Sequence, residues 1–225
     1  MYDIIVHIIC ISIESFAGDN TRCLTIVGRG MTDISELVVA TNNKNKLKEF
    51  REVLGNKFKL TSLEDNNIFV DIIENGNTFY ENALIKAKTV SKLCNKPAIA
   101  DDSGLVVPAL NGLPGINSAR YAGERATDEM NRKHLLENMK NIHDRSAYFL
   151  ACIVVYYPNG DIITSEGKTV GEILKEEKGT NGFGYDSIFY SYELGKTFAE
   201  SESTEKNIVS HRGRALQSLI IKLNV

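Results

Sequence analysis

Apolar residues recur along this chain with the two spacings that distinguish strands from helices. Short apolar runs predict buried strands at 36–40, 68–73, 97–100, 148–157 and 185–190, and a Pro-Asn-Gly turn at 158–160 predicts a hairpin into a further strand. Apolar residues at helical spacing predict helices that begin near Leu47 and cover 78–93, 127–142 and the stretch after Ser210. The folded part of the chain therefore begins as a strand, a polar turn and a helix.

Two of the predicted helices also have capping signals at their first residues. Thr78 with Glu81 three residues later is a capping box, and the helix that they open should end before Pro97. Ser210 can cap the last helix, whose apolar face we expect from Ala215, Leu216, Leu219, Ile220 and Leu223. The apolar stripe of the helix at 127–142 is Met130, Leu135, Met139 and Ile142, so we expect its methionines in the core.

Composition limits the classes of protein to which the chain can belong. With 225 residues, 43% hydrophobic and 24% charged, it suits one large globular domain or two small lobes with a real core. The formal net charge of −3 argues against a nucleic-acid-binding module, which would present a basic surface. The cysteines at 10, 23, 94 and 152 are widely spaced, which predicts no zinc site or disulfide framework and a reducing, cytoplasmic location.

The first thirty residues differ in character from the rest. The apolar run at 4–13 is interrupted by His7 and is too short to span a bilayer, so we expect no membrane partner. No basic segment precedes the run, which argues against a secretory signal. We expect 1–30 to be an N-terminal tail, poorly ordered or not part of the native protein, and 31–225 to be the functional domain.

The pair Asp101 and Asp102 directly follows the predicted strand at 97–100, and Ser103 and Gly104 come next. Side chains of an extended chain alternate between faces, so one carboxylate can face a cleft while the other is bound to backbone or to a lysine. Carboxyl ends of strands are where open α/β sheets place ligand chemistry. The alternative is a solvated turn, but the stiff loop that Gly112, Pro114 and Gly115 form downstream favours a site.

The polar turn at 41–46 can direct backbone N–H groups of a helix N-terminus at an anion, and Lys46 adds positive charge. It is not a Walker A loop, because no GxxxxGK[ST] sequence occurs. The alternative is an Asn-rich helix cap with surface lysines. His211 and Arg212 would lie in the first turn of the last helix, where positive charge opposes the helix dipole. They are expected to contact an anion or a ligand, or else to represent a small, tolerated cost in stability.

Four ordered motifs resemble those of the inosine triphosphate pyrophosphatases, and they cover the chain from residue 37 to its C-terminus. The first is Thr41-Asn42-Asn43-x-x-Lys46, and the second is Glu74-x-Gly76-x-Thr78-Phe79-x-Glu81-Asn82-Ala83. The third is Ala100-Asp101-Asp102-Ser103-Gly104-Leu105 with Pro114-Gly115-Ile116 and Ser118-Ala119-Arg120-Tyr121. The fourth is Gly182-Phe183-Gly184-Tyr185-Asp186 with Lys206 and Ser210-His211-Arg212-Gly213.

The resemblance implies a nucleoside triphosphate pyrophosphatase that removes deaminated purine nucleotides, ITP, dITP and XTP. Water would attack the α-phosphorus and release a monophosphate and pyrophosphate, with one Mg²⁺ per active site. The implied fold is α/β, with a mixed, twisted central sheet flanked by helices and two lobes with a cleft between them. The implied assembly is a homodimer, with the nucleotide as its partner and no nucleic acid.

The resemblance also implies roles for individual residues. Asp102 would be the proton acceptor, and Glu74, Asp102 and Asp101 would hold the metal, although the metal would lower the pKa of Asp102 and make its role as a base less secure. Lys46, Lys86 and Lys206 would bind phosphates, and Phe183 would stack on the purine. The residues expected to bind substrate are Thr41, Asn42, Asn43, Lys44, Asn45, Lys46, Lys86, Ser103, Phe183, Gly184, Tyr185, Asp186, Lys206, His211 and Arg212.

The chain departs from the family pattern at three positions. Asn42 replaces the usual glycine, so we expect Asn42 to adopt a positive φ, and Ser187 and Asn117 replace a proline and an aromatic residue. Two alternatives stay open: a related pyrophosphatase for modified pyrimidine or methylated nucleotides, and a non-catalytic nucleotide- or RNA-binding module. The carboxylates argue against the second, because an anion-binding groove gains nothing from acids unless a metal intervenes.

Overall fold

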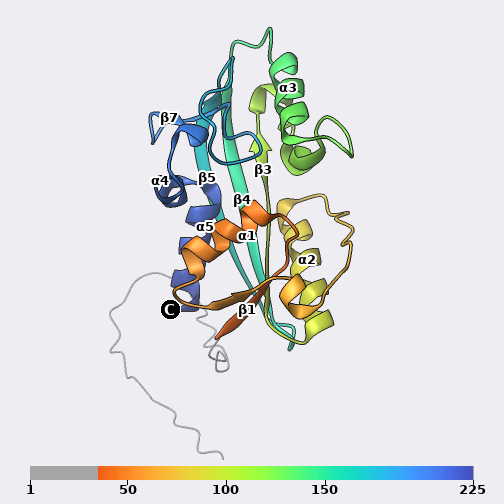
Figure 1. Cartoon of the computed structure of the whole chain (residues 1–225). Coiled ribbons are helices and arrows are strands. Elements are labelled where there is room, and N and C mark those ends of the chain that lie inside the picture. The colour runs from red at the N-terminus through yellow and green to blue at the C-terminus, as the bar shows by residue number, and fades with distance from the viewer. Residues whose placement is uncertain (1–34, 225) are drawn as a thin grey trace, which may run out of the picture. The chain divides into compact units, whose positions relative to one another are not determined.

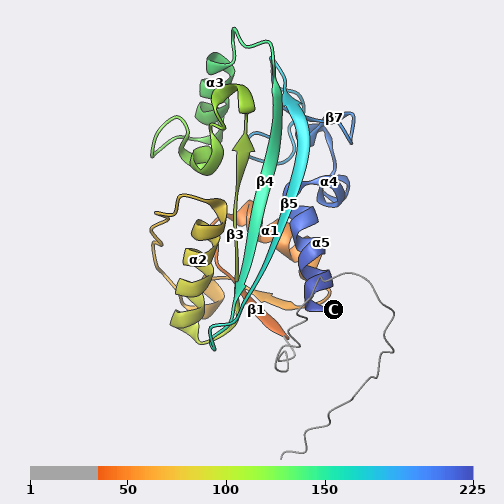
Figure 2. The same cartoon turned by 180° about the vertical axis from the view of Figure 1, so that it is seen from behind.

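The computed structural model describes residues 35–224, so the predicted tail at 1–30 lies outside the described residues. These residues form one seven-stranded mixed sheet in the order β2-β1-β3-β4-β5-β6-β7, with helices on both faces (Figures 1 and 2). The strands are β1 (Glu36–Val39), β2 (Lys59–Thr61), β3 (Ala98–Val106), β4 (Ser146–Tyr156), β5 (Ile162–Ile173), β6 (Phe189–Ser191) and β7 (Lys196–Thr197). The helices are α1 (Lys44–Leu54), α2 (Phe79–Cys94), α3 (Asp128–Asn138), α4 (Ser203–Val209) and α5 (His211–Leu223).

Strand alternation divides the core between the two faces of the sheet. Leu37, Val39 and Ile99 pack with α1 and α5, whereas their neighbours Val38 and Ala98 pack with α2 on the opposite face. Side chains on a strand point alternately to its two faces, so β1, β3 and β4 each contribute to both clusters. A third apolar cluster lies where the ends of β3 and β4 meet α3 and β6. The expected mixed sheet with flanking helices is confirmed, and its division into two lobes stays a prediction.

The central strand β3 changes partners along its length. Its first residues pair in parallel with β1, ending at Val39 opposite Ile99, while the whole of β3 pairs antiparallel with β4. β1 ends there, so within residues 35–224 no strand pairs with this edge of β3 at Asp101 and Asp102. The pair lies in the middle of β3 rather than at its end, so the alternative of a solvated turn is wrong. The aspartates do follow the carboxyl end of β1, the parallel neighbour.

The helix starts agree with the capping signals, with one shift. The Thr78 side chain accepts the Glu81 N–H, but the Glu81 carboxylate accepts the N–H of Asn77 rather than that of Thr78. Ser210 accepts the Gly213 N–H and caps α5, whose predicted apolar face is buried. The first turn of α5 lies tightly against β5: a Cβ on Gly167 would lie 2.1 Å from the carbonyl oxygen of His211. Glycine at 167 therefore allows the close approach that places His211.

The strand predicted at 68–73 is wrong, because this segment pairs with no strand of the described chain. Its alternation is still visible as burial: Ile68 is buried, whereas Phe69 and Ile73 are 82% and 78% exposed. The segment lies beside α2 (Figures 1 and 2), and Ile68, Val70 and Ile72 pack with the apolar cluster there, so alternate side chains are buried although the segment is not a strand. A short apolar run indicates which side chains are buried and does not show that the backbone joins a sheet.

Two further boundaries differ from the predictions. The helix predicted at 127–142 ends at Asn138, and Met130 is 50% exposed while Met139 is fully buried, so only one methionine belongs to the core. The strand predicted at 185–190 is confined to β6, because the preceding residues form a turn. No helix within residues 35–224 is both long and apolar enough to cross a membrane.

Candidate active site

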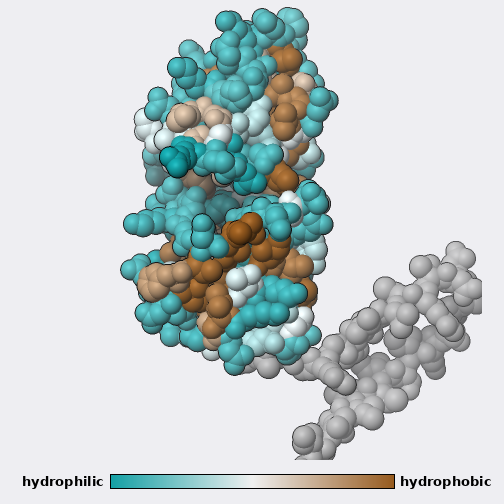
Figure 3. All heavy atoms as spheres, turned by 90° about the vertical axis from the view of Figure 1, so that its right-hand side faces the viewer, coloured by the Kyte–Doolittle hydropathy of each residue, from teal (hydrophilic) through white to brown (hydrophobic). Residues whose placement is uncertain are grey.

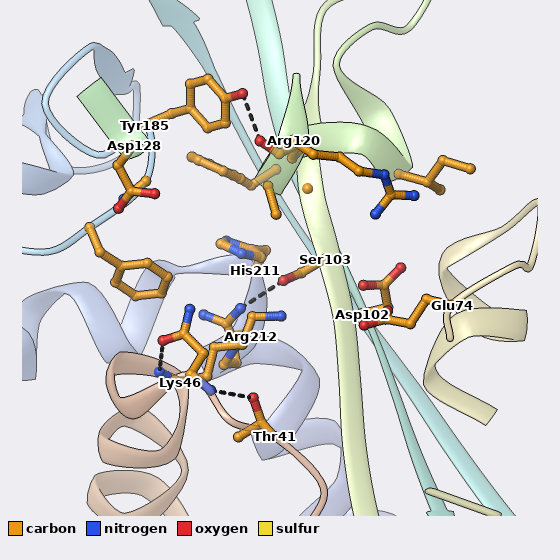
Figure 4. A pocket seen from close by; sticks show the side chains of 18 of the residues that line it. Thr41, Lys46, Glu74, Asp102, Ser103, Arg120, Asp128, Tyr185, His211 and Arg212 are labelled. Carbon is orange, nitrogen blue, oxygen red and sulfur yellow. Dashed lines mark hydrogen bonds between the residues drawn. The ribbon is translucent and has the colours of Figure 1, made fainter. Parts of the chain in front are cut away.

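A cavity of about 330 Å³ opens beside the unpaired edge of β3. Figure 3 shows the corresponding hollow at mid-height of the molecule, and Figure 4 shows the side chains around it. Most predicted site residues line it, but Asp101, Lys44 and Asn45 do not. The predicted residues that it brings together are Thr41, Asn42, Asn43, Lys46, Glu74, Lys86, Asp102, Ser103, Phe183, Gly184, Tyr185, Asp186, Lys206, His211 and Arg212.

Glu74 and Asp102 come from distant segments and meet at one lysine. The Nζ atom of Lys86 in α2 lies 2.5 Å from Glu74 Oε2 and 3.2 Å from Asp102 Oδ1. Burial raises the pKa of Asp102, and the charge of Lys86 opposes that rise. The Lys86 ammonium loses hydration on burial, but the two carboxylates raise its pKa. Lys86 lies on the inner side of α2 and is buried, whereas Lys88 on the same helix is exposed.

Asp101 points to the opposite face of β3, as the alternation requires. Its carboxylate accepts hydrogen bonds from Arg212 of α5 at 2.8 and 3.0 Å and lies 3.2 Å from Lys46 Nζ of α1. Burial alone would raise the pKa of Asp101, but the charges of Arg212 and Lys46 hold it well below its ordinary value. The side chain is fully buried and does not line the cavity. The structure therefore favours a supporting role for Asp101 over the metal-ligand role implied by the resemblance.

Glu49 of α1 was absent from the predicted site and connects two of its cations. It is 8% exposed and accepts hydrogen bonds from Lys206 at 2.9 Å and from Arg212. Lys206 also donates to Asp186 at 2.6 Å and lies 4.9 Å from the centre of the Phe183 ring. Helical spacing could have indicated Glu49, because it follows Lys46 by three residues and therefore shares its face.

The loop that carries Phe183 is held by hydrogen bonds on both sides. The Phe183 N–H donates to Asp186, and the Gly184 N–H donates to Asp128 at the start of α3, at 2.9 and 2.8 Å. The Tyr185 hydroxyl donates to the carbonyl oxygen of Ser118 at 2.8 Å. Gly182 has φ +75°, a conformation that favours glycine. These contacts fix an aromatic wall on one side of the cavity.

Arg120 also lines the cavity. It belongs to the third sequence motif, but no role was predicted for it. Its nearest carboxylate is Glu124, 3.8 Å away and 88% exposed, whereas the other lining cations face buried carboxylates. Figure 4 shows the Arg120 side chain on the same side of the cavity as Glu74 and Asp102. An exposed ion pair of this kind contributes little, so Arg120 can contact an anionic ligand at small cost.

The turn at 41–46 lacks the positive φ expected at Asn42, and its contacts favour the helix-cap alternative over anion binding by backbone N–H groups. Asn42 is not among the residues with positive φ, so no left-handed turn is needed there. The Asn43 side chain caps α1 by accepting the N–H groups of Asn45 and Lys46 at 2.9 and 3.1 Å. These donors are thus already used within the helix. Thr41 and Lys46 still line the cavity, so the turn contributes side chains to it.

His211 is buried in the cavity wall with its ring stacked on Phe149, the ring centres 4.6 Å apart. Burial, together with the charges of Arg212 and Lys206, lowers the pKa of His211 well below 6.5, so its ring is neutral. Its Nδ1 atom has no hydrogen-bond partner among the described residues. This neutral, partly unsatisfied ring is available to a ligand.

We expect His211 to make the protein less stable in acid. The unfolded chain binds a proton at this imidazole below about pH 6.5 and the folded chain does not, so stability is complete above that pH and falls by up to about 1.4 kcal/mol per pH unit below it. Urea unfolding of His211→Gln should therefore show a shallower decline in the free energy of unfolding between about pH 6.5 and 5. A decline as steep as that of the unchanged protein would contradict the assignment.

Comparison with known proteins shows extensive similarity. The model of the Ham1 family matches residues 37–222. A dITP/XTP pyrophosphatase of Desulfotalea psychrophila is 49% identical over 83% of this chain and 84% of its own length. A dITP/XTP pyrophosphatase of Haemophilus influenzae is 49% identical over 84% of this chain and 98% of its own. A solved HAM1 protein structure from Coxiella burnetii superposes with a TM-score of 0.78 at 42% identity, covering 85% of this chain and 99% of that one.

Proposed function

This chain belongs to the Ham1 family, and from that membership and the cavity beside β3 we propose that it hydrolyses deaminated purine nucleoside triphosphates to the monophosphate and pyrophosphate. The proposal extends to this chain the activity for which its dITP/XTP pyrophosphatase relatives are named. One observation carries it: Glu74 and Asp102 face a set of cations, Lys46, Lys86 and Arg120, in a cavity that also has an aromatic wall. Carboxylates can hold a metal ion, cations can bind the triphosphate, and an aromatic ring can stack on the purine base.

A single Mg²⁺ per active site is the proposed cofactor, and the carboxylates suit it. Mg²⁺ is usually bound by one or two protein carboxylates, with waters and substrate phosphates completing its shell. Among residues 35–224 no group of three or more potential ligands is gathered, which is compatible with an ion that takes only two carboxylates from the protein. Glu74 and Asp102 are the proposed protein ligands. When bound, Mg²⁺ would neutralise phosphate charge and polarise the reacting phosphate.

The chain's own residues have separate proposed roles in the reaction. Water forms a bond to the α-phosphorus, the bond to the bridging oxygen of the β-phosphate breaks, and pyrophosphate leaves with the electron pair. Asp102 accepts the proton of the water, while Lys46, Lys86 and Arg120 bind phosphate oxygens. Lys206 lies between Glu49 and Asp186 beneath Phe183, so we propose that it supports the base wall as well as binding substrate.

Selectivity for the base is proposed to depend on the wall made by Phe183, His211 and Arg212. Hypoxanthine and xanthine have an oxo acceptor at position 6, where adenine has an amino donor. A site with buried donors leaves them unpaired when adenine enters, and such a mismatch discriminates strongly.

We also propose that the protein is a homodimer located in the cytoplasm. Sedimentation equilibrium would test the homodimer.

Pyrophosphate release by the purified chain tests the proposal. We expect release from XTP and dITP with Mg²⁺ at about a hundredfold or more the efficiency with dATP, because of the unpaired donors. Addition of EDTA should abolish release, and excess Mg²⁺ should restore it. Preference for dUTP over dITP would favour the pyrimidine alternative, and binding of XTP without Mg²⁺-dependent release would favour a binding module.

A further inference from the structure

A buried amide, Asn82, connects the segment that carries Glu74 to the carboxylate of Asp102. It lies in the first turn of α2 and is 2% exposed. Its Oδ1 accepts the N–H of Gly76 at 2.8 Å, and its Nδ2 donates to Asp102 Oδ2 at 3.2 Å. Because a backbone N–H can only donate, Oδ1 must face Gly76 and the donating Nδ2 then faces Asp102. The two bonds together fix the orientation of the amide.

The Glu74 segment depends on such bonds, because no strand pairing holds it. In the described part of the chain, the hydrogen bonds and the ion pair of residues 74–77 all involve side chains from the first two turns of α2. Asn77 donates to Glu81 at 2.6 Å, Gly76 donates to Asn82, and Glu74 pairs with Lys86. A Cβ on Gly76 would lie 2.6 Å from the Cβ of Glu81 and 2.8 Å from Asn82 Oδ1, so the close approach needs glycine. The distance between the segment and α2 is therefore set at residues 76 and 82.

Each oxygen of the Asp102 carboxylate receives one donor from α2. Lys86 is near Oδ1 and Asn82 is bonded to Oδ2. The lysine side chain is long and has many rotamers, whereas the short amide is already fixed by its bond to Gly76. Asn82 is thus the more rigid of the two contacts, and it alone connects Asp102 with the backbone of the Glu74 segment through a neutral group.

We propose that Asn82 is a positioning residue, which fixes the rotation of the Asp102 carboxylate and holds Glu74 where both acids can bind one divalent cation. The inference rests on the proposed function, because that function requires the cation. Hydrogen-bond partners of metal-ligating carboxylates orient their ligands, and their loss typically costs about ten- to a hundredfold in metal affinity or activity.

The variant Asn82→Leu keeps the branched shape and removes both hydrogen bonds. The Mg²⁺ concentration for half-maximal pyrophosphate release from XTP should rise about ten- to a hundredfold. The Mn²⁺ concentration that raises the melting temperature of the substrate-free protein should rise in parallel, because a bound ion stabilises only the folded state. Gly76→Ala blocks the approach of the segment without removing the donor to Asp102, and it should move both concentrations in the same direction.

Asn66→Leu is the matched control, because Asn66 makes amide hydrogen bonds to Thr61 and Ser62 outside the cavity. It should leave both metal concentrations unchanged, and melting curves without metal will show that the variants fold. Asn82→Ser replaces the leucine variant if that one does not fold.

Unchanged metal dependence in a folded Asn82 variant, or an equal change in Asn66→Leu, would overturn the inference. If the unchanged protein releases no pyrophosphate while Mn²⁺ stabilises it in an Asn82-dependent way, the proposed function fails and the positioning role stands. If Mn²⁺ does not stabilise the unchanged protein, the positioning role is itself refuted.

Discussion

Asp102→Asn should lower kcat for XTP by about 10²–10⁴-fold, the range over which a positioned acid or base accelerates a reaction. The amide keeps the size of the side chain but cannot accept the proton of the attacking water, and it is a poor ligand for Mg²⁺. Lys86 would still pair with Glu74, so the phosphate-binding cations stay in place. We therefore expect XTP to bind the variant, with its Kd measurable by calorimetry because turnover is slow.

Glu166→Gln is the matched control for this change. Glu166 is opposite Cys152 in the sheet, and Cys152 is opposite Asp102, but Glu166 is exposed and does not line the cavity. Its replacement should leave kcat and KM unchanged. Full activity of Asp102→Asn, with a normal melting curve, would show that the carboxylate is not part of the reaction and would remove the central residue of the proposed mechanism.

Arg212→Met should lower the free energy of unfolding by about 3–5 kcal/mol, because removal of one partner leaves buried opposite charges uncompensated. Arg212 is 2% exposed and donates to Asp101, Ser103 and Glu49. Burial would lower its pKa, but the two carboxylates raise it, so the guanidinium is charged at all accessible pH values. Urea unfolding at pH 7 measures the loss. Catalytic efficiency with XTP should fall as well, because Arg212 lines the cavity.

Two further variants separate the charge effect from simple loss of packing. Combining Arg212→Met with Glu49→Gln should recover part of the stability, because a buried amide costs less than an unpaired carboxylate. Arg214→Met, two residues along the same helix, removes a guanidinium whose side chain is 38% exposed and should cost less than about 1 kcal/mol. Equal losses in Arg212→Met and Arg214→Met would contradict the buried network.

Elements with two independent sequence signals were predicted correctly, whereas a segment with only one signal was not. α2 and α5 have both an apolar period and a capping side chain, and both begin where those signals place them. The run at 68–73 has only a period of two, and it predicted a strand that does not form. Burial follows from a side chain's own chemistry, whereas sheet membership also needs a partner strand, about which a local pattern contains no information.

Sequence motifs identified residues that line the cavity but missed partners that contact those residues, and the binding and catalytic roles stay predictions. The four motifs placed most of their polar residues in one cavity. Glu49 and Asn82 were missed as partners because their contacts lie with residues 163 and 20 positions away, Arg212 and Asp102. Lys44 and Asn45 do not line the cavity, because only some side chains of the turn face it, and their role in substrate binding stays a prediction.

The sequence by itself determined that Asp101 and Asp102 point to opposite faces, because an extended backbone alternates its side chains. It also determined where α2 and α5 begin along the chain. Only the tertiary structure decided that β1 ends opposite Ile99 and leaves the edge of β3 open. One cavity can therefore reach both faces of the strand, with Lys46 and Arg212 on one side and Lys86 on the other. Where a neighbouring strand stops depends on contacts between distant segments, and local patterns do not record them.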